Sequence, residues 1–254
     1  MASSIPLLTL AIPVGQSGDA TALRATFDSI ARTCSGLPID VLVQVGQADH
    51  AGFPAEVLDH PCSPQWAFEP DGGIYPAMNR LLERAAGQRI LFLGAGDRVL
   101  SGLTGAIVRW SGGDEKSQLE LGGVRLPDAE PKVPRHYPAR WDGSLLWRNT
   151  THHQGIAYPT ALLRDLGGFP EEYHILADYA VNLRLWSAKV NANWQAEEDW
   201  VTAAAGGVSR QFTPALYDEE RRLKQKELPF GLARWIQPFW IRLKSTWKRA
   251  GQPG

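Results

Sequence analysis

Two kinds of hydrophobic pattern alternate along the first hundred residues. Four short apolar runs are typical of buried strands, at residues 7–12, 40–45, 65–68 and 89–93. Between them, residues 22–32 and 74–86 place apolar side chains at helical spacing, one turn apart on a single face. Strands that alternate with helices in this way predict βαβ units and a mainly parallel sheet.

The pattern becomes less regular after residue 110. Residues 111–149 contain two glycine pairs, several prolines and three aromatic side chains that we expect to be exposed, Tyr137, Trp141 and Trp147. Such a segment predicts short strands and a long loop region that shapes a substrate pocket. Helical spacing returns at 160–166, before a glycine pair, and again at 175–188.

The C-terminal tail has an amphipathic pattern of its own. One helical stripe is apolar and consists of Leu232, Ile236, Phe239, Trp240, Leu243 and Trp247. The tail also holds five basic residues and no acidic residue after Glu227, and Pro238 predicts a kink or a break. Two hypotheses are open: a helix docked on the domain, or an interfacial helix over 229–250 that contacts anionic lipid.

Composition narrows the class of protein. The 254 residues are 44% hydrophobic and 21% charged, which is typical of a soluble globular chain. A net charge of −1 gives no reason to expect nucleic acid as a partner. Cys34 and Cys62 form no CxxC pair, so we expect neither a zinc site nor a disulfide framework.

The sequence also indicates where the protein acts. Pro13 interrupts the first apolar run, which lacks a basic leader and therefore predicts a strand rather than a signal peptide. No apolar stretch is long enough to cross a bilayer. We expect a cytoplasmic protein in a reducing compartment, peripheral at the inner face of the cell membrane.

Two acidic residues stand where chemistry is expected. Asp97 follows the apolar run 89–93, and ligands of open α/β sheets bind beyond the carboxyl ends of such strands. A carboxylate there suits a divalent metal ion on a diphosphate; the alternative is a cap for a helix beginning near Leu100. Asp178 lies within an apolar helical pattern, either facing solvent or held in a cleft as a general base. The nearby His152 and His153 are metal ligands, substrate contacts or solvated loop residues.

Two long blocks together resemble a known family. EPDGGIYPAMNRLLERAAGQRILFLGAGDRVL (69–100) and HHQGIAYPTALLRDLGGFPEEYHILADYAVNLRLW (152–186) resemble the family 2 glycosyltransferases with a GT-A fold. The most similar branch makes bacterial surface polysaccharides, including colanic acid and O-antigen. Order and spacing are also similar at PLLTLAIPVG and at GGVS (206–209), so the resemblance covers about residues 5–210.

This resemblance implies an α/β fold and a division of the chain. A mainly parallel, mixed sheet flanked by helices would form a GT-A domain over 1–210. Its first half, 5–100, would bind the nucleotide sugar, and its second half, 101–210, would hold the acceptor and the catalytic group. Residues 211–254 would form a helical, basic, tryptophan-rich tail.

The resemblance also implies an activity and a set of site residues. The activity is inverting transfer of a sugar from a UDP-, GDP- or dTDP-sugar to a lipid-linked or polysaccharide acceptor. Asp97 matches the position that binds Mn²⁺ or Mg²⁺, and Asp178 matches the catalytic base. His153 and Gln154 match a pair near the sugar and the acceptor. The donor-binding positions are matched by Pro13, Asp71, Asn79 and Arg80.

The chain departs from the family pattern at several polar positions. Val45 stands where an Asp reads the nucleobase, with Asp49 the next carboxylate along the chain. The other departures are Gly96 for the first carboxylate of the metal-binding motif, and Gly15-Gln16, Gly72 and Pro76 for polar residues. These losses motivate an alternative, a degenerate member that binds a sugar nucleotide or a partner without catalysis. A Rossmann oxidoreductase is disfavoured because no GxGxxG follows the first strand.

Overall fold

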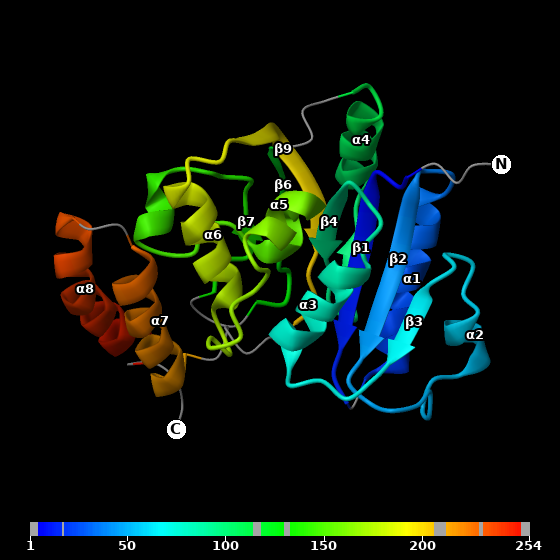
Figure 1. Ribbon diagram of the computed structural model, residues 1–254, viewed down its shortest axis with the longest axis horizontal. Helices are drawn as coiled ribbons and strands as arrows, with labels where there is room; N and C mark the ends of the chain where they lie inside the picture. The colour runs from blue at the N-terminus through cyan, green and yellow to red at the C-terminus, as the bar shows by residue number, and fades with distance from the viewer. Residues whose placement is uncertain are drawn as a thin grey trace.

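A nine-stranded mixed sheet organises the part of the chain that the computed structural model describes (Figure 1). That part comprises residues 5–16, 18–113, 118–129, 133–205, 212–228 and 231–249. The strand order is β3-β2-β1-β4-β8-β6-β9-β5, and β7 pairs with β6. The GGVS segment at 206–209 lies outside the described residues.

The first half of the chain has the predicted βαβ arrangement. Four strands run parallel, β1 (Leu8–Val14), β2 (Ile39–Val45), β3 (Gln65–Phe68) and β4 (Arg89–Phe92). The helices that join them are α1 (Ala20–Cys34), the short α2 (Ala55–Leu58) and α3 (Ile74–Arg84). Alternate strand residues point to opposite faces, so Leu42 packs with the α3 core while Val41 and Val43 pack with the α1 core. These parallel strands confirm the prediction from the apolar runs.

The second half makes the sheet mixed. Strand β8 (Ile156–Pro159) lies antiparallel between β4 and β6 (Leu119–Arg125), and β9 (Ala192–Thr202) runs parallel to β6. Two-residue strands β5 (Arg98–Val99) and β7 (His136–Tyr137) pair at its margins. The helices are α4 (Ser101–Trp110), α5 (Thr160–Asp165) and α6 (Ala177–Ser187), with short 3₁₀ turns η1 (Gly143–Leu146) and η2 (His153–Gly155).

The tail consists of two helices that lie at the end of the molecule remote from β1–β3 (Figure 1). Helix α7 (Pro214–Glu227) packs against α8 (Leu232–Arg249), and Pro238 lies inside α8 without dividing it. Helix α8 buries Gln237 and Ile241, whereas Phe239 is 78% exposed. The described part of the predicted apolar stripe is thus largely exposed. No helix in the described residues is both long and apolar enough to cross a membrane.

Two expectations about exposure are wrong. Trp141 is 8% exposed, because its indole Nε1 donates a hydrogen bond of 2.9 Å to the Val190 carbonyl and its ring packs in the core. Ile74, predicted to share the buried face of α3, is 50% exposed because it is the first residue of that helix, beyond the sheet that covers the later turns.

Candidate active site

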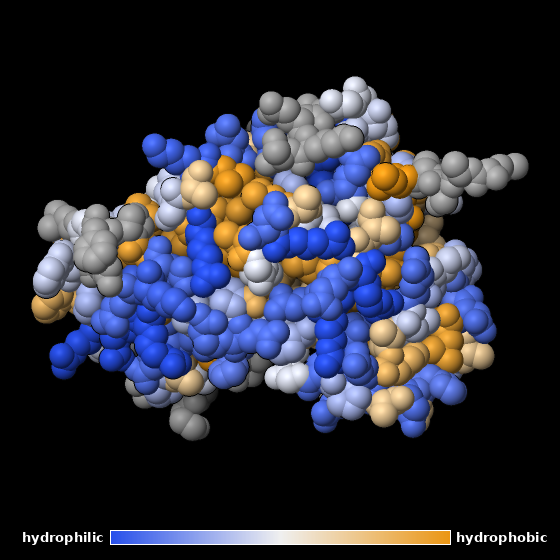
Figure 2. Space-filling model, in the orientation of Figure 1, coloured by the Kyte–Doolittle hydropathy of each residue, from blue (hydrophilic) through white to orange (hydrophobic). Residues whose placement is uncertain are grey.

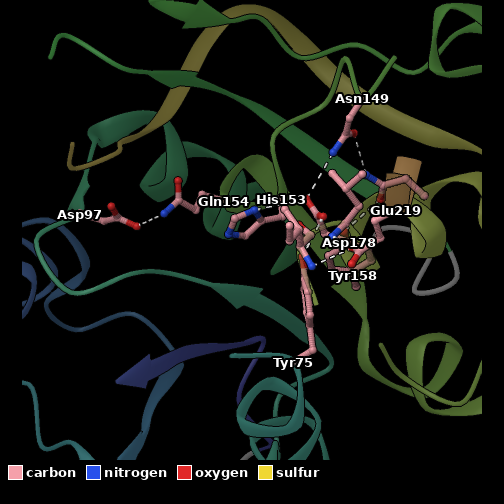
Figure 3. Close-up of polar contacts among 11 residues, drawn as sticks. Tyr75, Asp97, Asn149, His153, Gln154, Tyr158, Asp178 and Glu219 are labelled. Atoms are coloured by element: carbon pink, nitrogen blue, oxygen red, sulfur yellow. Dashed lines mark hydrogen bonds and ion pairs between the residues drawn. The ribbon is translucent and has the colours of Figure 1, made fainter. Parts of the chain in front are cut away.

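The turn η2 connects the two acidic residues singled out by the sequence (Figure 3). From this turn, the Gln154 side-chain amide donates a hydrogen bond to Asp97. The adjacent His153 extends the other way, with its Nδ1 3.5 Å from Asp178 Oδ2. Four predicted site residues therefore form one continuous line of polar groups between the end of β4 and the start of α6.

Asp178 is held in a cleft, as one of the two hypotheses for it predicts. Its side chain lies in the first turn of α6 and the residue is only 8% exposed. The Tyr75 hydroxyl lies 3.2 Å from Oδ1 and 2.8 Å from the Ile175 carbonyl oxygen, and Asn149 Nδ2 donates to Oδ2 at 3.3 Å. Burial raises the pKa of Tyr75 well above its ordinary value, and the neighbouring Asp178 charge raises it further. Tyr75 thus stays a neutral hydrogen-bond donor.

A buried polar network fixes the orientation of Asn149. Asn182, one turn after Asp178, is fully buried and donates from Nδ2 to Asn149 Oδ1 at 3.4 Å. The Tyr158 hydroxyl in turn donates to Asn182 Oδ1 at 3.1 Å. Because the Asn149 oxygen is engaged, its amide group points toward the Asp178 carboxylate (Figure 3). Burial and the charge of Asp178 raise the pKa of Tyr158, so its phenol also remains a donor.

Helix α7 anchors the segment that leads into α6. The Glu219 carboxylate, 3% exposed, accepts hydrogen bonds from the backbone amides of His174, Ile175 and Leu176 at 2.9, 2.8 and 2.7 Å. Amides at a helix start lack intrahelical partners and favour negative charge. Glu219 therefore fixes the start of the helix that bears Asp178.

Three contributors to this site were absent from the sequence-based prediction: Tyr75, Asn149 and Glu219. Tyr75 lies inside the quoted block 69–100, so its position in that block was an available signal. No local pattern marks the other two, because their partners are 29 to 45 residues away in the chain.

Asp178 and His153 face a cavity of about 730 Å³ between η2, α6 and the two tail helices. Arg140 and Arg148 add positive charge to its lining. Much of the remaining wall is apolar and includes Pro134, Pro138, Leu216, Trp240 and Leu243. A cavity of this size, with a few convergent polar groups in an apolar wall, is typical of a small-molecule site.

Asp97 is buried and engaged in hydrogen bonds, and its predicted metal-binding role stays a prediction. It is 2% exposed; Oδ2 accepts from Gly94 N at 2.6 Å and from the Gln154 amide, and Oδ1 accepts from Ala204 N at 2.8 Å. Both carboxylate oxygens are thus engaged in hydrogen bonds within the protein. The described residues also contain no group of three or more His, Cys, Asp and Glu side chains that could hold one. The helix-cap alternative for Asp97 is wrong, since Leu100 occupies the cap of α4. The carboxylate instead joins the β4 loop to the end of β9.

Three of the four predicted donor-binding residues lie near the carboxyl ends of β1–β3, and the fourth, Asn79, contacts the loop after α5. Pro13 lies in β1 opposite Gln44, and Asp71 lies in the loop before α3. Arg80 Nη1 donates to the Pro70 carbonyl at 2.9 Å and so supports that loop. Asn79 uses both amide hydrogens on Phe169 O and Glu171, which joins α3 to the loop after α5; its donor contact stays a prediction.

The fold and the site define a class. An open α/β sheet, polar groups beyond the carboxyl ends of its strands and a buried carboxylate on a cavity are the features of an enzyme that binds a ligand at the sheet edge. No protein-family model matches the chain. Individual proteins do.

The comparisons identify the family. The chain is 32% identical over 191 residues to a PGL/p-HBAD biosynthesis glycosyltransferase of Mycobacterium tuberculosis, covering 72% of this chain and 70% of that one. An uncharacterized glycosyltransferase of the same species is 30% identical over 122 residues, covering 47% and 46%. This chain belongs to the glycosyltransferases.

Solved structures agree on the fold. Staphylococcus aureus TarS (1–349) superposes with a TM-score of 0.62 at 14% identity, covering 96% of this chain and 72% of that one. The mannosyltransferase PcManGT of Pyrobaculum calidifontis, solved with GDP-Man and Mn²⁺, gives 0.57 at 16% identity, covering 97% and 71%. The predicted GT-A architecture is confirmed.

Proposed function

We propose that this enzyme is an inverting glycosyltransferase that moves a sugar from a nucleotide-sugar donor to an acceptor hydroxyl group in the 730 Å³ cavity. The observation that carries the proposal is the buried Asp178 carboxylate facing that cavity, braced by Tyr75 and Asn149. Structural neighbours that bind UDP-GlcNAc and GDP-Man support a nucleotide-sugar donor. We place the reaction in bacterial surface-glycan synthesis, of which colanic acid and O-antigen assembly are examples.

In this mechanism Asp178 acts as the general base. The acceptor hydroxyl gives its proton to Asp178 while its oxygen attacks the anomeric carbon, and the bond from that carbon to the diphosphate breaks on the opposite side. Attack opposite the leaving group inverts the anomeric configuration. Tyr75 and Asn149 hold the carboxylate in place, and His153 lies where an acceptor or sugar hydroxyl would pass.

We route no step through a metal ion, because the oxygens of Asp97 are occupied by Gly94, Gln154 and Ala204. The Mn²⁺ ion in the PcManGT structure is an observation on that protein alone. Transfer is therefore to be measured with Mn²⁺, with Mg²⁺ and with a chelator, as separate arms of one assay.

The cavity wall favours an acceptor that carries an apolar group. Trp240 and Leu243 line the cavity from α8, yet both also remain substantially exposed, at 43% and 65%. The apolar wall is thus continuous with an apolar surface. A lipid-linked acceptor would place its sugar beside Asp178 and its apolar part along α8.

The same helix suits contact with an anionic membrane surface. Trp235 and Phe239 are each 78% exposed, and large aromatic side chains are favoured at the headgroup level. The chain after Glu227 holds five basic and no acidic residues, so the preceding residues have a net charge of −6. This asymmetry favours approach of α8 to anionic lipid.

Vesicle flotation tests the membrane contact. Wild-type protein should float with vesicles that contain anionic lipid and remain unbound with zwitterionic vesicles. Trp235→Ala with Phe239→Ala should lose flotation, while Trp194→Ala, a matched change in an exposed strand residue, should not. Equal flotation of all variants would remove α8 from the interaction.

A panel of UDP-, GDP- and dTDP-sugars with apolar glycoside acceptors tests the activity. We expect transfer that Asp178→Asn abolishes and Asp165→Asn, an exposed carboxylate on α5, leaves intact. NMR of the product should show the opposite anomeric configuration to the donor. Absence of both donor binding and transfer across the panel would contradict the proposal.

The buried, hydrogen-bonded state of Asp97 and the missing carboxylates at Val45 and Gly96 favour one alternative, a sugar-nucleotide-binding or partner-binding module without turnover. Donor binding with no transfer to any acceptor would select this alternative. Turnover that depends on Asp178 would exclude it.

A further inference from the structure

A second cavity shares a wall with the cavity that Asp178 faces. Residues 140–149 form that wall: Arg140 lines the first cavity, whereas the adjacent Trp141 lines the second. The second cavity has a volume of about 620 Å³ and lies between η1, the end of α6 and the start of β9. The proposed mechanism uses none of the residues that line it.

Three tryptophan side chains line this second cavity. The Trp141 indole is fixed by its hydrogen bond to the Val190 carbonyl at 2.9 Å, and its ring meets Trp186 edge-on, with centroids 5.9 Å apart. Trp194 reaches the cavity from β9 and is 44% exposed. Apolar side chains also reach the surface between α6 and β9 (Figure 2). The cavity therefore offers one exposed indole beside two indoles that the fold holds in place.

Polar side chains complete the lining of the second cavity. Ser187, Lys189 and Asn191 are exposed there, and Lys189 is the only charged residue among the described residues that line it. Within the described part of the chain, no hydrogen bond or ion pair engages these three side chains. A hydroxyl, an ammonium and an amide group thus remain available beside the tryptophan rings.

The backbone at Lys189 is strained in a way that glycine would avoid. Its φ is 59°, in the left-handed region, and its amide donates to Trp186 O at 3.0 Å in the turn that ends α6. Glycine is the usual residue at such a helix end, because it has no Cβ. Strained residues of this kind cluster at functional positions. The chain thus tolerates strain where the lysine supplies an ammonium group to the cavity.

A pyranose ring matches this combination of groups. Its C–H bonds form a face of weak positive partial charge, which is attracted to the negative face of an indole ring. Its hydroxyl groups both donate and accept hydrogen bonds, so they pair with an ammonium group, a hydroxyl or an amide. One lysine, the only cation in the described lining, does not balance the charge of a nucleoside diphosphate.

We propose that the second cavity is a carbohydrate-binding site, distinct from the catalytic cavity, in which a neutral pyranose unit stacks on Trp194 while its hydroxyl groups contact Lys189 and Asn191. The inference goes beyond the proposed function, since it assigns a site that takes no part in the transfer step. Because the two cavities share the wall 140–149, a glycan bound there lies close to the acceptor that faces Asp178. Such a site would hold the enzyme on a glycan between transfers.

Saturation-transfer NMR with neutral oligosaccharides tests the site directly. Wild-type protein should bind at least one of maltotetraose, cellotetraose and mannotetraose, and an excess of UDP or GDP should not displace it. Trp194→Ala should weaken that binding about tenfold, because the stacking surface is lost. Trp235→Ala is the matched control and should bind as wild type does, since Trp235 is an exposed tryptophan on α8 that does not line the cavity.

Lys189→Gly provides a second variant that keeps the fold. Glycine adopts a φ of 59° without strain, so loss of the ammonium group alone should weaken the same saccharide about threefold. No saccharide binding by wild-type protein, unchanged binding in both variants, or displacement by UDP or GDP would overturn this site. The proposed function would then still stand, because transfer to a monosaccharide acceptor is measured separately. Absence of donor binding and of transfer, with saccharide binding that Trp194→Ala weakens, would overturn the proposed function alone.

Discussion

The Glu219 carboxylate offers a quantitative test of how the site is held. It accepts three backbone hydrogen bonds of 2.7 to 2.9 Å while almost fully buried. A buried donor left unsatisfied costs about 1–3 kcal/mol. Glu219→Ala leaves three backbone amides without their acceptor. It should therefore lower the free energy of unfolding by about 4 kcal/mol, allowing for partial hydration of these amides. Glu219→Gln keeps one accepting oxygen and should cost about 2 kcal/mol.

Urea unfolding followed by circular dichroism measures these values. With a denaturant slope of about 1–3 kcal/mol per molar, Glu219→Ala should shift the midpoint by more than about 1 M. Hydrogen exchange should also accelerate at the amides of residues 174–176. Asp218→Asn is the matched control, because Asp218 is the preceding residue on α7 but is exposed and pairs with Arg221 on the same helix. A Glu219→Ala midpoint equal to that of Asp218→Asn would refute the reasoning.

Three further predictions follow from the described contacts. Burial acts to raise the pKa of Asp199, but hydrogen bonds from His136 and Arg125 lower it overall. The ionised carboxylate therefore stabilises the fold above about pH 4, and this contribution is lost as the pH falls further. In an acid titration of the free energy of unfolding, the difference between wild-type protein and Asp199→Asn should shrink below that pH. Burial raises the pKa of Cys34 to about 11 and of Cys62 to about 12, so neither thiol should react quickly with a disulfide reagent at pH 8, whereas both should react in urea. Tyr75→Phe removes a donor beside Asp178 and should lower kcat by about tenfold in a transfer assay.

Each of these predictions has a contradicting result. A stability gap for Asp199→Asn that stays constant from pH 7 to pH 3 would exclude its ion pairs as the cause. One rapidly modified thiol in the native protein would contradict the pKa values. Full activity of Tyr75→Phe, at unchanged donor affinity, would show that its hydroxyl does not brace the base.

Local patterns predicted the four parallel strands and the two long helices of the first half of the fold, but not the short α2. The apolar runs at 40–45 and 65–68 fall within β2 and β3. Strand β2 is buried over its last five residues and therefore needs a nearly continuous apolar sequence, whereas β3 is the partly exposed edge strand. Strand β9 lacked such a signal: its sequence, ANWQAEEDWVT, is mostly polar, and it forms by pairing with β6. Gly122 permits that pairing, since a Cβ there would lie 2.0 Å from the Trp200 ring.

The site was predictable in part for the same reason. Asp178 and His153 stand in motifs that can be read along the chain, and the fold brings them together. The state of Asp97 depends on Gln154 and Ala204, which are 57 and 107 residues away, so its burial could not be read locally. Glu219 likewise acts across 43 to 45 residues, through a helix whose own sequence indicates only an amphipathic surface.

The central claim is that Asp178 removes the proton of an acceptor bound in the cavity. The most direct measurement compares kcat for wild-type protein and Asp178→Asn, with donor affinity determined in parallel by calorimetry. The account predicts that kcat falls by about 10²–10⁴-fold, the usual contribution of a general base, while donor affinity changes little. Turnover by Asp178→Asn within a few fold of wild type would contradict it.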